Sequence, residues 1–276
     1  MTQKLPPIEH VSSEFSGPEA FAHGSMLFAR ATEFEMPEET RRCLDTVEYD
    51  TFKLAMQVQL GGLSLLGSKK FDDAEWQPVP LACFAVDHLL WGFIAATNGQ
   101  VRVAFTLVRA AVEASIFEAA AALQPDTFRK KWNTRQGTGG AVLRELIGLP
   151  PRVRALLDVA WDLTVEYGHA SHIPVLTSVG SAREKGESVK TMSFAGQYAG
   201  PFDAKLLDHI VRIYALSAFA ACEAMNVALR VHMRDSTYWS NQYEELVKKL
   251  NARASVPASW VTKRGIALTR KLRGDA

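Results

Sequence analysis

Cysteine is scarce in this sequence: the 276 residues include only three, Cys43, Cys83 and Cys222. No two of them form a CxxC motif, so neither a zinc ribbon nor a dithiol redox site is indicated. Three widely separated thiols also cannot build the disulfide framework that small secreted proteins use. We therefore expect a cytoplasmic protein with reduced cysteines, stabilised by the burial of apolar side chains.

The sequence also lacks an excess of charge of either sign. It has 31 lysines and arginines against 30 aspartates and glutamates, which gives a net charge of +1. Such a balance provides no long-range field that would attract nucleic acid or an anionic membrane. Two short basic stretches stand out, Arg129–Trp132 and a C-terminal tail at 256–276. We interpret both stretches as solvated surfaces. The weaker alternative is that they bind nucleic-acid phosphates, most simply through the tail, and such binding would weaken as the salt concentration rises.

Signatures of common enzyme classes are missing as well. There is no GxSxG motif, no P-loop and no GxGxxG, and no alternation of strands and helices indicates an α/β fold. One ExxH motif, Glu166–His169, is half of a di-iron bundle signature, which needs two such motifs. A second motif would begin at Glu223, but its histidine position is occupied by Asn226. We therefore expect no cofactor and assign no metal ligands, while a metal-binding helical bundle stays open as a second alternative.

The sequence is rich in apolar segments with helical character. Hydrophobic residues make up 47% of the chain, and three runs are nearly long enough to span a membrane: Leu81–Thr97, Val101–Leu123 and Ile213–Val231. Each run contains ionisable side chains, and burying such groups in lipid is costly. We interpret the runs as core helices of a water-soluble protein and expect no membrane partner.

The run Val101–Leu123 is apolar on almost every face, which is typical of a helix buried in a bundle. Arg102, Thr106, Arg109 and Glu113 interrupt it, and helical spacing places all four on one narrow stripe. Arg109 and Glu113 are four residues apart, so their side chains can touch. The stripe is either the wetted edge of the helix or a polar seam packed against other helices, where the charges must be paired.

Prolines and glycines divide the rest of the chain into helical segments. We expect one all-α domain at 17–255, a multi-helix bundle around the central helix at about 101–123. A draped or disordered N-terminus at 1–16 precedes it, and the basic tail at 256–276 follows it. Weak alternation in Ser188–Ala195 favours a strand of a small hairpin near 188–200. Gly61 and Gly62 are expected to end or kink a long helix that starts near Met36.

Candidate ligand-binding residues are Asp87, His88 and His172. Asp87 and His88 lie within an apolar run, where a histidine is most simply a hydrogen-bonded core residue. If a cleft opens there, a desolvated histidine beside a carboxylate is suited to act as a general base. His172 follows His169 by three residues, and a single metal ion between the two is a minor alternative.

Two segments resemble a family of all-helical bacterial proteins whose shared domain has no established function. The first is Leu107–Ala119, with its arginine and glutamate four residues apart, and the second is Leu163–Ser171. By position, the matching residues are Arg109, Glu113, Thr164 and His169. This sequence departs from the pattern in two places, since Thr164 replaces the usual serine and Gly168 precedes the histidine. The resemblance implies a helical fold and an Arg–Glu–His cluster.

The leading functional prediction is an interaction or self-associating module, because apolar helix surface is abundant and catalytic motifs are missing. Its partner would be a protein or a second copy of the chain. The alternative is a nucleic-acid-acting or defence-type enzyme that uses Arg109, Glu113 and His169 as catalytic residues.

Overall fold

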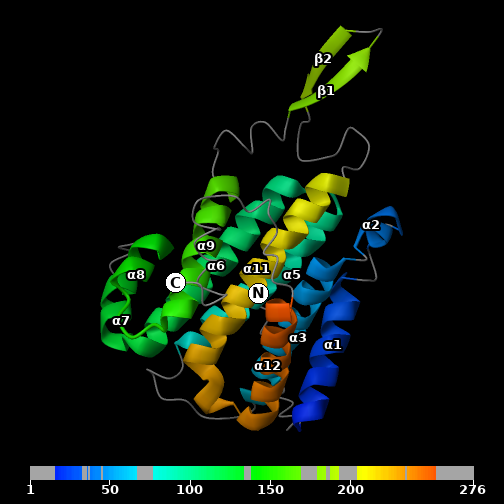
Figure 1. Cartoon of the computed structure of the whole chain (residues 1–276). Coiled ribbons are helices and arrows are strands. Elements are labelled where there is room, and N and C mark those ends of the chain that lie inside the picture. Colours follow the sequence, from blue (N-terminus) through cyan, green and yellow to red (C-terminus); the bar gives the residue numbers. More distant parts are fainter. Residues whose placement is uncertain are drawn as a thin grey trace, which may run out of the picture.

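The computed structural model describes residues 16–32, 36, 38–44, 46–66, 77–133, 138–168, 179–184, 187–192, 204–233 and 235–252. The described part is a packed bundle of helices, as Figure 1 shows, which confirms the all-α prediction. The α-helices in chain order are α1 (Gly17–Thr32), α2 (Glu38–Cys43), α3 (Val47–Leu66), α5 (Pro78–Thr97), α6 (Val101–Leu123), α7 (Pro125–Asn133), α8 (Gly139–Glu145), α9 (Pro151–Gly168), α11 (Ala204–Leu229) and α12 (Ser236–Ala252). A short 3-10 turn, η1 (Arg230–His232), links α11 to the residues before α12.

Helix α6 begins and ends at the residues predicted from the sequence, and it lies at the centre of the bundle. It packs against α5, α7, α8, α9 and α11. Asn98 and Gly99 end α5: their backbone N–H groups donate to the carbonyls of Ile94 and Ala96, each at 3.0 Å. Gly99 has a φ of 82°, which glycine adopts without strain. This short turn makes α5 and α6 an antiparallel hairpin.

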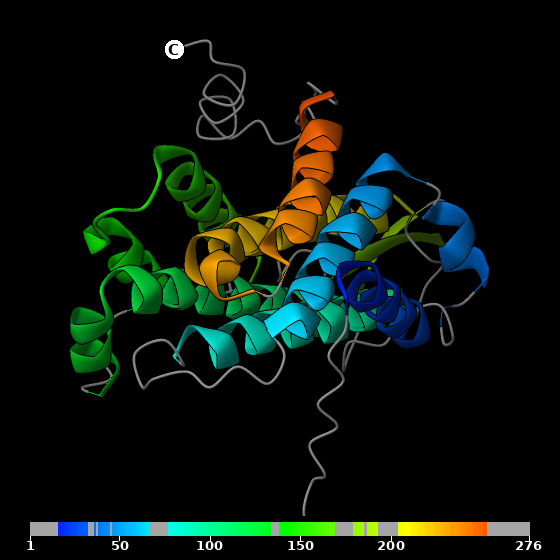
Figure 2. The ribbon, with the colours of Figure 1, turned by 90° about the horizontal axis from the view of Figure 1, so that it is seen from below.

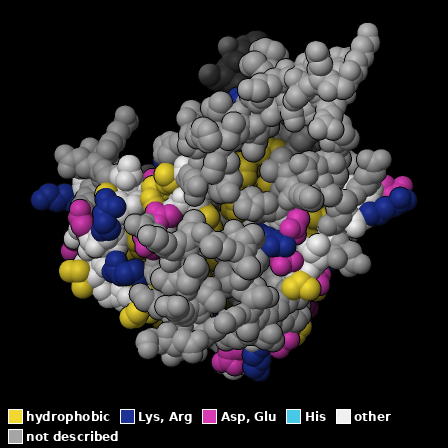
Figure 3. All heavy atoms as spheres, turned by 45° about the horizontal axis from the view of Figure 1, so that its top comes forward, with side chains coloured by type: hydrophobic (Ala, Val, Ile, Leu, Met, Phe, Trp, Pro, Cys, Tyr) yellow, Lys and Arg dark blue, Asp and Glu magenta, His cyan; other side chains and the backbone are white. Residues whose placement is uncertain are grey.

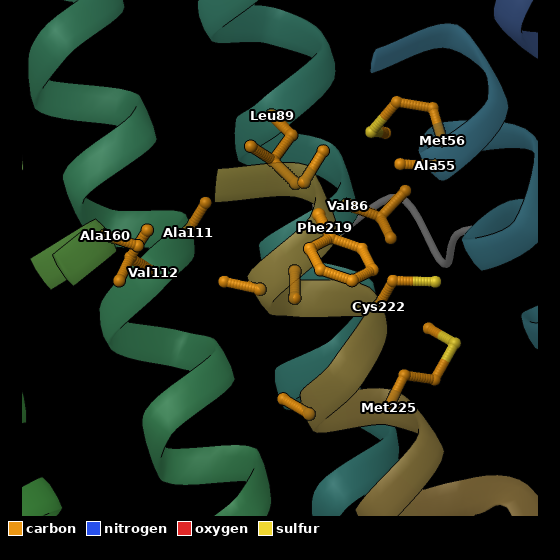
Figure 4. Packing of buried hydrophobic residues seen from close by; sticks show 14 of the residues in the cluster. Ala55, Met56, Val86, Leu89, Ala111, Val112, Ala160, Phe219, Cys222 and Met225 are labelled. Carbon is orange, nitrogen blue, oxygen red and sulfur yellow. The ribbon is translucent and has the colours of Figure 1, made fainter. Parts of the chain in front are cut away.

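The core is formed mainly by α6 and α11, with α3, α5 and α9 packed around them. Figure 4 shows side chains of these helices meeting there, with Phe219 of α11 beside Val86 of α5. Tyr214 of α11 is buried, and its hydroxyl donates to the carbonyl of Ala104 at 2.7 Å. The ring of Tyr214 also lies edge-on to Phe52 of α3 and Phe93 of α5. These contacts join four helices, α3, α5, α6 and α11, at one point.

The glycine pair in α3 does not end the helix, so the prediction of a break at Gly61–Gly62 was wrong. A Cβ on Gly61 would lie 2.9 Å from the ring of Phe21 in α1, and one on Gly62 would lie 2.6 Å from Nε1 of Trp239 in α12. The two glycines therefore let α1 and α12 approach α3 closely. The prediction of one long helix was also wrong: α2 begins at Glu38, close to the predicted start near Met36, but it ends at Cys43, and α3 is a separate helix.

A two-stranded antiparallel hairpin is present in addition to the helices. β1 (Val179–Glu184) pairs with β2 (Glu187–Met192), and Val179 lies opposite Met192. Figure 1 shows the pair apart from the helices. The predicted strand Ser188–Ala195 overlaps β2, but its partner strand precedes it, so the predicted range 188–200 was placed too late. Residues 1–15 and 253–276 lie outside the described residues, and they include nearly all of the predicted N-terminal segment and the whole of the predicted basic tail.

Candidate functional site

The polar stripe of α6 is half wet and half covered. Arg102 and Thr106 are exposed, whereas Arg109 and Glu113 are partly buried where α8 and α9 pack against α6. Each of the two interpretations of the stripe therefore holds for one half of the helix. A helical wheel could not separate the two halves, because it fixes the direction of a side chain but not the neighbour that it meets.

Arg109 lies over the indole ring of Trp161. Its guanidinium carbon is 5.4 Å from the ring centroid, and Trp161 of α9 is a buried core residue. A guanidinium at this distance from an indole is attracted by the ring's quadrupole. Arg109 thus helps to hold α9 against α6.

Glu113 binds the first residue of α8. Its Oε1 accepts a hydrogen bond from the backbone N–H of Gly139 at 2.8 Å. Thr138, at the N-cap position of α8, makes no side-chain capping bond. Glu113 therefore supplies from a different helix the acceptor that a capping residue normally provides, and its negative charge suits the positive end of the helix dipole.

Gly139 and Gly140 are needed for this arrangement. A Cβ on Gly139 would lie 3.0 Å from Trp161 and 3.1 Å from Cγ of Glu113, and one on Gly140 would lie 2.5 Å from Trp161 Nε1. Glycines that the sequence favours as a flexible connection are instead the contact surface between α8, α9 and Glu113.

Of the other residues that matched the predicted cluster, the structure describes only Thr164. Thr164 is fully buried, and its hydroxyl donates to the carbonyl of Trp161 at 3.0 Å within α9. His169 and His172 lie outside the described residues. The described part of the cluster is therefore Arg109 and Glu113, each with a packing role.

Asp87 and His88 lie on the outer face of α5, so the prediction of a core histidine was wrong. Asp87 is exposed, and the ring of His88 stacks on the exposed ring of Phe84, with the centroids 3.7 Å apart. His88 Nδ1 is 2.9 Å from the carbonyl oxygen of Phe84. Apolar neighbours in the sequence did not imply burial here, because α5 lies at the edge of the bundle and other helices cover only one of its faces.

A pocket of about 650 Å³ opens between the N-terminal end of α5, the C-terminal half of α6 and α7. Its volume lies within the range of about 300–1,000 Å³ that small-molecule sites usually have. The polar residues in its wall are Gln77, Glu113 and Arg129, and the apolar ones are Pro80, Leu81, Phe84, Ala110, Ala114, Phe117 and Phe128.

The pocket lies at one end of an exposed apolar face on the α5–α6 hairpin. Phe84 and Trp91 of α5 and Val103 of α6 are 45%, 64% and 45% exposed. Phe84 also lines the pocket, so pocket and face are continuous. Figure 2 shows α5 and α6 side by side along one edge of the bundle. We call Phe84, Trp91 and Val103 the hairpin face.

Sequence reasoning missed two buried carboxyl groups on the core side. Glu118 of α6 is 1% exposed, and no described residue bonds its Oε1. Burial raises the pKa of the Glu118 carboxyl well above its ordinary value. The apolar sequence around Glu118 was the signal that could have indicated its burial. An ionisable group in such a run lies either at the edge of the core or within the core in its neutral form.

Glu223 of α11 is 3% exposed, although the sequence places it near a wetted end of the helix. Arg152 Nη2 of α9 lies 3.2 Å from its Oε1, and the Tyr243 hydroxyl of α12 donates to its carboxylate. Burial raises the pKa of Glu223, while Tyr243 and Arg152 oppose that rise. The three side chains join α9, α11 and α12 at one point. They are positioned as a structural network, because no pocket described above reaches them.

The described residues also bear on the predictions of metal binding and nucleic-acid binding. Within the described residues, no group of three or more histidine, cysteine, aspartate or glutamate side chains could hold a metal ion. Exposed charges of both signs are interspersed on the face seen in Figure 3. Arg129 and Lys130 of the predicted basic stretch are exposed on α7, whereas the whole of the basic tail lies outside the described residues.

Two described segments, Pro78–Thr97 and Ile210–His232, are long and apolar enough to cross a membrane by length and composition. Half of the first and 78% of the second is buried in the bundle. Core helices of soluble proteins meet the same criterion, so a cytoplasmic protein without a membrane partner stays a prediction.

No protein-family model, no curated protein and no solved structure matches this chain. The resemblance to the bacterial helical family therefore stays a prediction, and the function must be argued from the described residues.

Proposed function

We propose that the protein is a non-catalytic interaction module that self-associates through the hairpin face. The observation that carries the proposal is the 64% exposure of Trp91, with Phe84 and Val103 also about half exposed on the same pair of helices. Exposed apolar patches on a folded protein mark interaction surfaces, and tryptophan is enriched among the residues that dominate binding energy.

A second copy of the chain is the occupant that fits this face. An isologous dimer places the same patch on both sides of the interface, so one apolar face covers another. Asp87 of α5 and Arg102 of α6 are also exposed on the hairpin, and opposite charges can pair across a two-fold axis. The net charge of +1 means that two copies repel each other only weakly.

The positions of Arg109 and Glu113 support a binding module over the predicted enzyme. Arg109 holds Trp161, and Glu113 caps α8. Side chains engaged in packing α8 and α9 are suited to maintaining a scaffold, and their geometry provides no nucleophile and no proton relay.

Sedimentation velocity over a wide range of protein concentration tests the proposal. The wild-type chain should sediment as a dimer that dissociates on dilution, and Trp91→Ala should shift the equilibrium to the monomer. Val103→Ser and Val231→Ser form a matched pair. Val231 is 83% exposed but lies on η1, which packs against α11 and α12.

Only the change at Val103 should weaken the dimer. A wild-type chain that is monomeric at every concentration would overturn the proposal. So would equal effects of the two valine substitutions.

A further inference from the structure

The pocket beside α7 carries a charge pattern of its own. Glu113 is partly buried in its wall, next to Ala110, Ala114 and Phe117 on α6. Arg129 also lines the pocket but is exposed to solvent. Water and salt screen an exposed charge far more than one set among apolar side chains. Of the two charged side chains in the pocket wall, Glu113 is therefore the less screened one.

Glu113 is held in place and still has capacity to bind. Its Oε1 accepts the backbone N–H of Gly139 at 2.8 Å, which fixes the orientation of the carboxylate. A carboxylate has about four lone-pair sites on its two oxygens, so one accepted hydrogen bond leaves room for a further donor. A carboxylate fixed before binding loses little conformational entropy when a cation arrives.

The remainder of the wall suits the apolar body of the same ligand. Leu81 and Phe84 of α5, Phe117 of α6 and Phe128 of α7 all line the pocket, and the rings of Phe117 and Phe128 have centroids 6.1 Å apart. Aromatic rings bury apolar surface and also attract a cation at their faces. Both the carboxylate and the rings therefore favour a protonated amine.

We propose that this pocket binds a small molecule with an aromatic or alkyl body and a protonated amino group, with Glu113 as the ligand for the ammonium. The pocket and the hairpin face share only Phe84. Ligand binding can therefore be measured independently of self-association.

Three probes with the same indole ring test the charge preference by isothermal titration calorimetry. At neutral pH tryptamine carries an ammonium, tryptophol a hydroxyl and indole-3-propionate a carboxylate. Tryptamine should bind about tenfold more tightly than tryptophol, because both probes can donate a hydrogen bond to Glu113 but only the ammonium adds an attraction between opposite charges. The carboxylate should bind most weakly. Equal affinities for the three probes, or no binding by any of them, would overturn the proposal.

Two variants locate the site. Glu113→Gln keeps an oxygen that can accept from Gly139 and should remove the preference for tryptamine over tryptophol. Asp126→Asn is the matched control, because it removes the same charge from an exposed position on α7 that does not line the pocket. A preference that survives Glu113→Gln, or that Asp126→Asn also removes, would refute the role of Glu113.

Ala110→Leu provides a test that does not depend on charge. Ala110 lines the pocket and is partly exposed, so a larger side chain there can occupy the cavity without entering the core. Binding of both tryptamine and tryptophol should be lost while thermal melting is unchanged. Undiminished binding would place the ligand elsewhere. Trp91→Ala, made to disrupt the dimer, should still bind tryptamine, so failure of self-association and failure of ligand binding are distinguished.

Discussion

Oε1 of Glu113 lies 2.8 Å from the backbone nitrogen of Gly139, a residue 26 positions later in the chain. One carboxylate thereby caps α8 and forms part of a pocket wall. The contact also explains why α8 starts where it does, because Thr138 makes no capping bond of its own.

Loss of this cap should loosen α8 specifically. We expect Glu113→Ala to lower the free energy of unfolding by about 1–2 kcal/mol, the usual cost of removing a helix cap. Glu113→Gln should cost less, since its amide oxygen can still accept the hydrogen bond. Hydrogen exchange at the Gly139 amide measures the effect directly. Unchanged exchange in Glu113→Ala would show that the bond contributes nothing in solution.

Gly140 should not tolerate a side chain. Its Cβ would lie 2.5 Å from Nε1 of buried Trp161, so Gly140→Ala should destabilise the protein by about 1–3 kcal/mol through overpacking. All three nearest atoms belong to the pyrrole part of the indole. Trp161→Phe should therefore suppress part of the defect, and thermal melting of the two single variants and the double variant tests this. Additive losses would contradict the packing explanation.

Glu118 should make stability depend on pH with a defined sign. Burial raises the pKa of its carboxyl in the folded state. The folded chain therefore keeps a proton that the unfolded chain releases, and stability is lost as the pH rises above about 4.5 towards the folded-state pKa. Glu118→Gln removes this loss, so its advantage over the wild type should grow with pH in urea unfolding experiments. Exposed Glu244→Gln should show no such trend.

Arg152 and Glu223 should behave as a coupled pair. Arg152→Met leaves a buried carboxylate with only Tyr243 as a partner and should destabilise the protein by about 1–3 kcal/mol, reduced from the value for fully buried pairs because Arg152 is partly exposed. Adding Glu223→Met should recover most of the loss, since no unpaired charge then remains. A double variant as unstable as the sum of the single ones would show that the pair is uncoupled.

Cys83 offers a test of the hairpin face without mutation. Its side chain is exposed on α5 next to Phe84, whereas Cys222 is buried. Partial burial of the sulfur and the nearby Asp87 raise the pKa of the Cys83 thiol, so labelling should be slow enough to follow. We expect the alkylation rate of Cys83, measured by mass spectrometry of its peptide, to fall as protein concentration rises and the dimer covers α5. A rate independent of concentration would count against this interface.

Prediction from the sequence succeeded for features that neighbouring residues determine. The limits of α6 follow from the run of apolar side chains, a pattern that depends only on residues close together in the chain. Prediction failed where a distant helix decides the outcome. Gly61 and Gly62 would break an isolated helix, but α1 and α12 pack against them, and Glu223 is buried only because α9 and α12 bring Arg152 and Tyr243 to it.

The helical bundle and the shared stripe of Arg109 and Glu113 follow from the order of the amino acids alone, because the helical repeat sets the direction of every side chain. Packing between helices fixes which side chains on each stripe are covered. Burial depends on the surface of another helix, so Glu113 came to face Gly139 and a pocket, Glu118 entered the core, and His88 stayed on the outside. The candidate site lies where these non-local contacts meet.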